Sequence, residues 1–420
     1  MRSSLSLPLL VLGLGVTLAA CSDDAPTAAA PSETMQSVSP EETLSQPEET
    51  LSQEELDTAL IEATWAGDAV AVEDLIERGA DVDHQDETQQ SSFLIAASEG
   101  DLDILRITLD AGADVTALDS FDGTALIRAA ERGHAMVVGD LIRAGVDLDH
   151  VNNLGYQAIH EAAWLGRDDA DYATTIRVLI AAGATVDRPS DRQGLTPAQL
   201  AGRRGFTGLS GVYEATVAPV VEDEADTTLL RAAADGDADL VARALRAGAD
   251  IDARSADGRT ALLQASIGDH VDAARVLVAL GADPDVLDDR HDTAWLVTGV
   301  TGSVEMLETL LPAEPDLTIV NRFGGTSVIP ASERGHVDYV RRAVETGIDV
   351  NHVNQLGWTA LLEAVILGDG GEAHQQIVDI LLEAGADPSI TDNDGMTALA
   401  HAEQRGYERI ATSLRAAENG

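Results

Sequence analysis

The side chains of this sequence that could do chemistry are ten histidines, one cysteine and many aspartates and glutamates. A zinc site needs histidines or cysteines at short, regular spacings, and no pair of histidines here has such a spacing. Asp235, Asp237 and Asp239 alternate as at the start of a calcium-binding loop, but the later glycine and the closing glutamate are missing. The sequence therefore predicts no metal site.

The motifs of common enzymes are missing as well. The sequence contains no lysine, so a phosphate-binding loop that ends in Gly-Lys-Ser or Gly-Lys-Thr is impossible. Gly208-Leu-Ser210-Gly211 lacks the Gly-x-Ser-x-Gly spacing of a nucleophile elbow. We therefore expect a protein that is not an enzyme, with no catalytic residues, no cofactor and no small-molecule substrate.

Cys21 is the only cysteine, and its position is informative. Arg2 precedes an uncharged stretch, 5–20, which has the length of a signal-peptide core and is too short to predict a transmembrane helix. The stretch ends in Leu18-Ala-Ala-Cys21, which resembles the lipobox of bacterial lipoproteins. That resemblance implies cleavage before Cys21 and a lipid on its side chain. The alternative is an ordinary secretory signal followed by an incidental cysteine.

Two segments follow from this interpretation. Residues 1–20 are predicted to be a signal peptide, and residues 21–52, rich in Ala, Pro, Ser, Thr and Glu, a flexible tether. The protein is then expected to be a cell-envelope lipoprotein. It would lie in the outer leaflet of the plasma membrane or, in a bacterium with two membranes, on the periplasmic face of the outer membrane.

From residue 53 onward, a glycine recurs at the end of an apolar stretch. Gly79, Gly112 and Gly145 lie 33 residues apart, as do Gly248 and Gly281, and an aspartate follows two residues after each. A period near 33 residues resembles the ankyrin repeat, in which each unit has two short helices and a projecting turn. The resemblance implies an all-α fold, an ankyrin-repeat solenoid.

The unit pattern predicts the role of individual residues. Thr124, Thr260, Thr359 and Thr397 each precede Ala-Leu and are expected to cap first helices; the aspartates after Gly67, Gly100, Gly236 and Gly268 are expected to cap second helices. His134 and His336 occupy a position where ankyrin repeats commonly carry a structural histidine.

Eleven units are expected, and they form two related arrays. Glu131-Arg-Gly-His134 recurs 202 positions later as Glu333-Arg-Gly-His336, and five-residue insertions around 167–173 and 369–375 share this offset. We predict a first ankyrin array at 53–215, an irregular junction at 216–226 and a second array at 227–420. The unit that ends in Pro312-Ala-Glu-Pro315 lacks the usual glycine.

The charge balance is strongly acidic. The chain has 26 basic and 73 acidic residues, a formal net charge of −47. Such a surface repels phosphate backbones, so no nucleic-acid partner is expected. Two interpretations remain, namely a highly solvated surface suited to high salt and a surface that recruits a basic partner.

Aromatic residues at positions expected to be exposed are candidate contacts for a protein partner. In the ankyrin pattern, Tyr156, Trp358, Trp65 and Trp164 fall at places that face the concave surface. The alternative is packing between neighbouring units. The turns before Tyr156 and Trp358 repeat His-Val-Asn, which adds four candidates, His150, Asn152, His352 and Asn354.

Together these features predict a non-catalytic scaffold that mediates protein–protein interaction at the bacterial cell envelope. Its partner is a protein, and its contact with the membrane is the lipid. The alternative is a structural or stress-protective envelope component with no dedicated single partner.

The Cys21→Ala variant is expected to leave the membrane and appear in the soluble envelope or the medium, because acyl chains on Cys21 would be the anchor. Membrane fractionation followed by immunoblotting measures this release. Processed Cys21→Ala protein that stays in the membrane fraction would show that another element anchors the chain.

Overall fold

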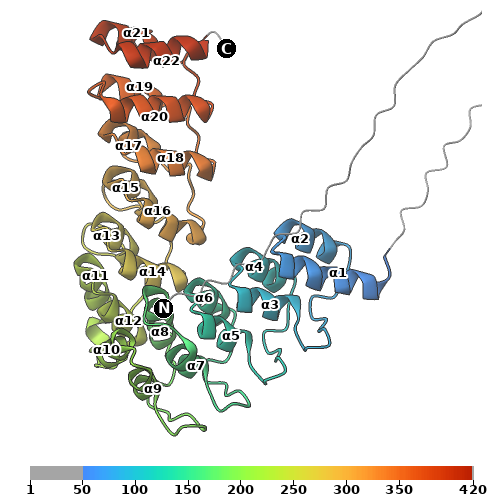
Figure 1. Cartoon of the computed structure of the whole chain (residues 1–420). Helices are drawn as coiled ribbons and strands as arrows, with labels where there is room; N and C mark the ends of the chain where they lie inside the picture. Colours follow the sequence, from blue (N-terminus) through green and yellow to red (C-terminus); the bar gives the residue numbers. More distant parts are fainter. Residues whose placement is uncertain (1–50, 419–420) are drawn as a thin grey trace, which may run out of the picture. The chain divides into compact units, whose positions relative to one another are not determined.

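The computed structural model of the chain describes residues 51–418. The predicted signal peptide, the lipidation site Cys21 and nearly all of the predicted tether lie outside the described residues. Residues 51–418 belong to one compact unit. It contains 22 α-helices and no β-strand among the described residues, so the expected all-α fold of eleven helix pairs is confirmed (Figure 1).

The first array has five helix pairs. Its helices are α1 (Gln53–Ala66), α2 (Ala69–Glu77), α3 (Ser92–Glu99), α4 (Leu102–Asp110), α5 (Ala125–Arg132), α6 (Ala135–Arg143), α7 (Ala158–Leu165), α8 (Ala170–Ala181), α9 (Pro197–Arg204) and α10 (Thr207–Thr216).

The second array has six pairs, and one 3₁₀ turn, η1 (Glu222–Glu224), precedes it. Its helices are α11 (Ala225–Asp235), α12 (Ala238–Arg246), α13 (Ala261–Ile267), α14 (Val271–Ala279), α15 (Ala294–Thr301), α16 (Val304–Leu310), α17 (Val328–Arg334), α18 (Val337–Ala343), α19 (Ala360–Ile366), α20 (Glu372–Glu383), α21 (Ala398–Arg405) and α22 (Glu408–Glu418). Two further 3₁₀ turns are η2 (Leu311–Ala313) and η3 (Val344–Thr346).

Side-chain caps begin the helices as the sequence predicts, with one exception. All four predicted threonines accept a hydrogen bond from the backbone N–H three residues later. Asp68, Asp101 and Asp237 do the same for second helices. Asp269 does not cap α14, which was a wrong expectation, because α13 ends early and Asp269 itself takes the left-handed conformation.

The two five-residue insertions lengthen second helices. Both α8 and α20 have 12 residues, whereas α2, α4 and α6 have nine. The extension brings Tyr172 of α8 to the end of α5, where its hydroxyl donates to the carbonyl of Glu131 at 2.9 Å. At the equivalent place His374 of α20 lies 3.0 Å from the carbonyl of Glu333. Each insertion therefore ties its unit to the one before it.

Aspartates link the turns of several units to the turn of the next unit. The side chain of Asp83 accepts a hydrogen bond from the backbone N–H of Asp114 at 2.7 Å, and Asp252 accepts one from Asp283 at 3.0 Å. Asn351 replaces the aspartate at one step and binds the N–H of Asp387 at 2.7 Å. These bonds satisfy turn backbone groups, and they give many of the acidic side chains a structural role.

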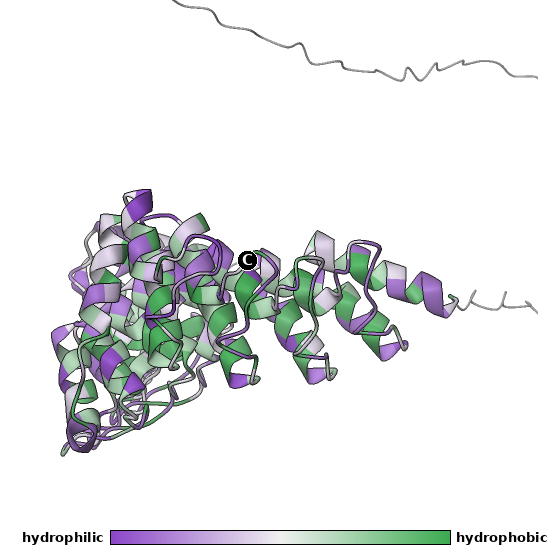
Figure 2. Ribbon diagram, turned by 90° about the horizontal axis from the view of Figure 1, so that it is seen from below, coloured by the Kyte–Doolittle hydropathy of each residue, from purple (hydrophilic) through white to green (hydrophobic). Residues whose placement is uncertain are grey.

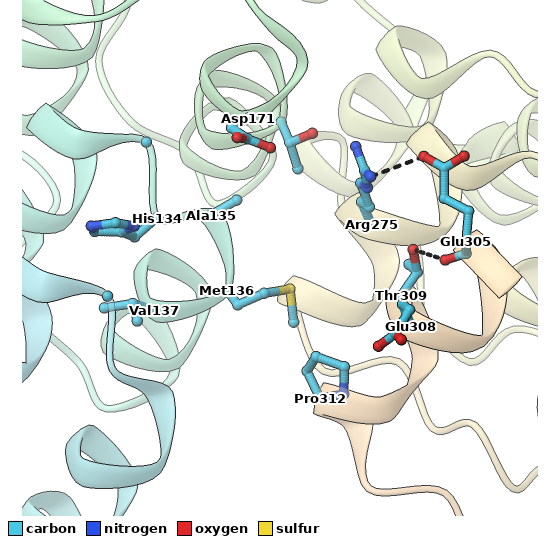
Figure 3. A pocket seen from close by; sticks show the side chains of 13 residues that line it. His134, Ala135, Met136, Val137, Asp171, Arg275, Glu305, Glu308, Thr309 and Pro312 are labelled. Atoms are coloured by element: carbon cyan, nitrogen blue, oxygen red, sulfur yellow. Dashed lines mark hydrogen bonds and ion pairs between the residues drawn. The ribbon is translucent and has the colours of Figure 1, made fainter. Parts of the chain in front are cut away.

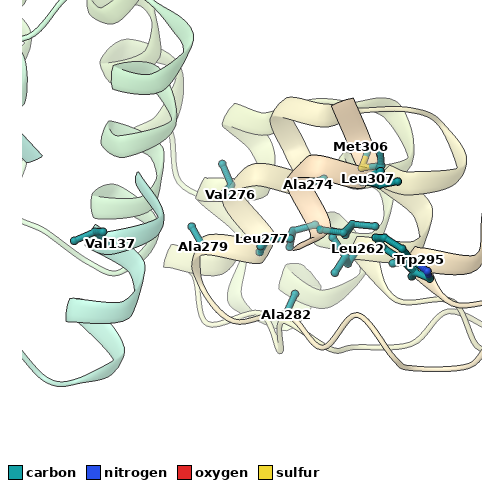
Figure 4. Close-up of a cluster of buried hydrophobic side chains, with 14 of the residues drawn as sticks. Val137, Leu262, Ala274, Val276, Leu277, Ala279, Ala282, Trp295, Met306 and Leu307 are labelled. Carbon is teal, nitrogen blue, oxygen red and sulfur yellow. The ribbon is translucent and has the colours of Figure 1, made fainter. Parts of the chain in front are cut away.

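The core runs between the two helix layers of each stack. Phe93 of α3 and Trp295 of α15 are 0% and 1% exposed. Apolar colour follows the helices, and polar colour gathers at helix ends and in turns (Figure 2). In the second array, Trp295 of α15 shares a cluster with Leu262, Met306 and Leu307 of its neighbours (Figure 4). Because each unit buries its apolar faces against adjacent units, the fold depends on stacking.

The second helices of the two arrays also pack against one another. Helix α14 contacts α6 and α8, while α12 contacts α8 and α10 (Figure 1). At the closest point Gly139 of α6 faces the carbonyl of Ala279 in α14, and a Cβ atom added to Gly139 would lie 1.8 Å from that oxygen. Only glycine permits this approach of the two backbones.

Arginines bind across this contact between arrays. Asp140 of α6 is 6% exposed and accepts hydrogen bonds from Arg106 and Arg143. Arg106 also donates to the carbonyl of Pro312 at 2.8 Å, and Arg143 donates to the carbonyl of Ala279. The buried carboxylate thus holds two arginines that bind backbone oxygens of the second array.

The unit without a closing glycine contributes to the same contact. Glu314 takes the left-handed conformation, with φ of 53°, that glycine takes elsewhere. Its carboxylate pairs with Arg106 of the first array. The departure from the repeat pattern at Pro312–Pro315 therefore places two acceptors, a carbonyl and a carboxylate, beside one arginine of the other array.

Candidate functional site

Tyr156 is not an exposed contact residue, so that expectation was wrong. Its side chain is 3% exposed, its hydroxyl accepts a hydrogen bond from Gln193, and its ring centre lies 6.4 Å from that of His160. Asn152 closes the turn by accepting a hydrogen bond from the N–H of Tyr156 at 3.0 Å. The next unit covers the ring, which makes Tyr156 part of the packing between units.

The three tryptophans differ in exposure. Trp65 is 52% exposed, as expected of a contact residue. Trp164 is half-buried, and the guanidinium carbon of Arg204 lies 5.4 Å from its ring centre. Trp358 is also half-buried and packs against the core with one part of its surface. Of the predicted aromatic contacts, Trp65 is therefore the most accessible.

The repeated His-Val-Asn motif has a structural role. The Nε2 atoms of His150 and His352 lie 2.7 Å from the carbonyls of Asp122 and Gly324 in the preceding turns. Asn152 and Asn354 are only 4% and 7% exposed. The expectation that the two asparagines contact a partner was wrong, because their side chains point into the protein.

Each buried asparagine binds a buried glutamate that the sequence analysis missed. The Nδ2 atom of Asn152 donates to Glu161 at 2.8 Å, and that of Asn354 donates to Glu363 at 2.8 Å. Glu161 is 1% exposed and Glu363 is 6% exposed. One feature of the sequence could have indicated these residues. A glutamate lies inside a mostly apolar helix in both arrays, at the same 202-residue offset.

Burial changes the acidity of both glutamates. Loss of solvation, opposed by the hydrogen bond from Asn152 and assisted by the charge of Glu131, raises the pKa of Glu161 to about 7. Loss of solvation, followed by the charge of Glu333, raises the pKa of Glu363 to about 7. Both carboxyls can therefore change charge near neutral pH.

The surroundings of the two glutamates differ between the arrays. In the first array Arg128 of α5 pairs with Asp119 and Glu131 and lowers the pKa of Glu161 by its charge. In the second array Pro330 stands at the position of Arg128. There an open pocket of about 190 Å³ is lined by Asn321, Phe323, Pro330, Glu333, Leu356 and Glu363.

A second cavity, of about 440 Å³, lies between the arrays (Figure 3). Met136 reaches into it from α6, and Arg275, Glu305 and Pro312 line it from the second array. Arg275 donates to Glu305 at 3.1 Å. The cavity has apolar and charged walls, and its arginine is already paired with Glu305.

Among residues 51–418, no group of three His, Cys, Asp or Glu side chains is arranged to hold a metal ion. Within the same described part of the chain, each helix is too short or too polar to cross a bilayer.

Stacked helix pairs with linked turns define a repeat scaffold, and comparisons with known proteins agree. Residues 93–190 and 294–392 match the family described as ankyrin repeats (3 copies), and residues 229–278 match ankyrin repeats (many copies). The chain belongs to the ankyrin-repeat family, which is generally non-enzymatic and serves protein–protein interaction.

Individual relatives match parts of the chain. YahD of Escherichia coli (strain K12), named as an ankyrin repeat protein, is 54% identical over 56 residues, which are 13% of this chain and 28% of YahD. The chain therefore spans little more than a quarter of that relative. An ankyrin repeat domain from Acinetobacter baumannii AYE is 46% identical and covers 45% of this chain and 97% of its own, with a TM-score of 0.44. The ankyrin repeat protein EF0377 is 38% identical with the same coverage and TM-score.

We predict that the two glutamates lower stability as the pH rises. Unfolded glutamate has a pKa near 4.5, so between pH 4.5 and about 7 the folded chain keeps protons that the unfolded chain has lost. Stability is fully present below this window and falls across it, by at most about 1.4 kcal/mol per pH unit for each group. The double variant Glu161→Gln, Glu363→Gln stays neutral, so its urea midpoint should fall less between pH 5 and pH 8.

The matched control is Glu62→Gln, which removes a carboxylate from an exposed position. It should keep the pH dependence of the unchanged protein. An equal pH dependence in the double variant and the control would contradict the assignment of raised pKa values to these two sites.

Proposed function

We propose that the chain is a non-catalytic scaffold that binds a protein partner at the bacterial cell envelope. The observation that carries the proposal is the pair of ankyrin arrays fixed to each other through their second helices. This contact covers second-helix surfaces and leaves the first helices and projecting turns of both arrays for partners. Rigid stacked surfaces of this kind are suited to extended protein interfaces.

The proposed location rests on residues 1–21, which combine a signal-peptide pattern with a lipobox-like end. The resemblance of residues 18–21 to a lipobox supports a lipid on Cys21 and hence a cell-envelope lipoprotein. The acidic surface supports a basic partner over nucleic acid, since like charges repel. Some of the acidic residues have a structural role, because aspartates in the turns accept backbone hydrogen bonds. The distribution of charge alone therefore does not define the binding face.

Affinity purification from solubilised envelope, followed by mass spectrometry, tests the proposal. The full chain is the bait, and a second exported protein of similar net charge is the matched control for electrostatic capture. We expect a stoichiometric protein partner that the control does not capture at physiological salt. Capture of no specific partner would contradict the scaffold function and favour the alternative, a structural or stress-protective envelope component.

A further inference from the structure

Arg128 occupies a well-defined site in the first array. Its Nε donates to Asp119, its Nη1 donates to Glu131 at 2.8 Å, and its guanidinium carbon lies 5.1 Å from the centre of the Phe121 ring. The arginine side chain is 18% exposed. An aromatic face and two carboxylates around one planar cation form a site suited to guanidinium.

The second array repeats most of this site without the arginine. Phe323, Glu333 and Glu363 stand 202 positions after Phe121, Glu131 and Glu161. Pro330 stands where Arg128 would be, and proline supplies no charge and no donor. Walls that surround an arginine in one array thus surround a pocket of about 190 Å³ in the other.

The carboxylates of this pocket have no cation of their own. Glu363 is more than nine-tenths buried, one of its oxygens is bound by Asn354, and the side chain lines the pocket. Within residues 51–418, neither Glu333 nor Glu363 forms an ion pair. A buried carboxylate such as that of Glu363 is costly unless a positive charge compensates it.

An arginine beside the Phe323 ring is engaged elsewhere. Arg322 lies over the Phe323 ring at 4.5 Å, but it pairs with Asp292 of the preceding unit at 3.6 Å and does not line the pocket. In the first array Arg192 also acts on Glu161 from the following turn, whereas the corresponding turn of the second array, 392–395, contains no basic residue.

We propose that the pocket between Phe323, Glu333 and Glu363 takes an arginine side chain of the partner protein. Its guanidinium stacks on the Phe323 ring and binds the two carboxylates. The first array gives the precedent for the ring and for Glu333, because Arg128 lies over Phe121 and donates to Glu131. Arg128 acts on Glu161, the equivalent of Glu363, through its charge. The inference rests on the proposed partner-binding function and names the chemistry that the partner presents. Asn321 stands at the position of Asp119, so the second-array site has two carboxylates where the first array has three.

Arginine fits this site better than lysine. A planar guanidinium can cover an aromatic ring while its separate N–H groups bind two carboxylates, whereas an ammonium group is a compact, strongly hydrated charge. The net charge of −47 attracts any cation, so the test must separate the pocket from the acidic surface in general.

The probe is N-acetyl-arginine amide, titrated into the full chain at pH 8 and physiological salt and followed by calorimetry or NMR. One molecule is expected to bind per chain. The citrulline analogue, which has a similar shape but no charge, and the lysine analogue are each expected to bind at least about ten-fold more weakly.

Variants of both arrays locate the binding. Glu333→Gln and Glu363→Gln should weaken the arginine probe about ten-fold or more, because each removes a charge-assisted hydrogen bond. Pro330→Arg should abolish binding by placing an arginine of the chain itself in the pocket. The matched control, Glu131→Gln in the first array, should leave binding unchanged. Arg128→Ala should create a second, weaker site for the probe.

Unchanged binding to Pro330→Arg, or no binding to the unchanged protein, would overturn the proposal. If a melting curve shows that Pro330→Arg is unfolded, the two glutamine variants still test the pocket, because they keep the helix intact. A captured partner that binds Pro330→Arg as tightly as the unchanged protein would leave the scaffold function standing and refute the pocket. Specific probe binding without any captured partner would contradict the scaffold function instead.

Discussion

The arrangement of the two arrays depends on the contact between α6 and α14 at Gly139. A Cβ atom at this position would lie 1.8 Å from the carbonyl oxygen of Ala279, so no other residue allows the same approach. Close backbones bring the ends of the second helices within reach of arginine side chains, and Asp140 holds two of these arginines in place. Neutralisation by arginine offsets the cost of burying the Asp140 carboxylate.

This contact explains two departures from the repeat pattern. Pro312 and Glu314 replace the usual turn glycine and its neighbours, and both offer oxygens to Arg106 of the other array. In a single stack the second helices form one outer face. In this protein the second helices of one array contact those of the other array and form the interface between them. As a consequence, the pocket at Phe323, Glu333 and Glu363 lies on a surface that the contact between arrays leaves open.

Sequence periodicity predicted the helix pairs and the threonine caps, because both follow from local spacing. Tyr156 was placed wrongly, since the ring is covered by the turn of the following unit, a contact that one repeat does not reveal. The approach at Gly139 depends on residues 140 positions apart and left no periodic signal. The asparagines and glutamates of the two Asn–Glu pairs recur in the sequence at the 202-residue offset. Their burial and the raised pKa values of the glutamates could be found only from the packed structure.

The distance between α4 and α18 in solution tests the contact between arrays most directly. Spin labels at Asp103→Cys and Asp338→Cys, both exposed positions, are introduced in a chain that also carries Cys21→Ser. Electron paramagnetic resonance should give one narrow distance distribution. Adding Gly139→Ala should broaden and shift it with helicity preserved, whereas Gly211→Ala, where a Cβ meets no atom within 4 Å, should leave it unchanged. An identical distribution for Gly139→Ala and Gly211→Ala would contradict the account.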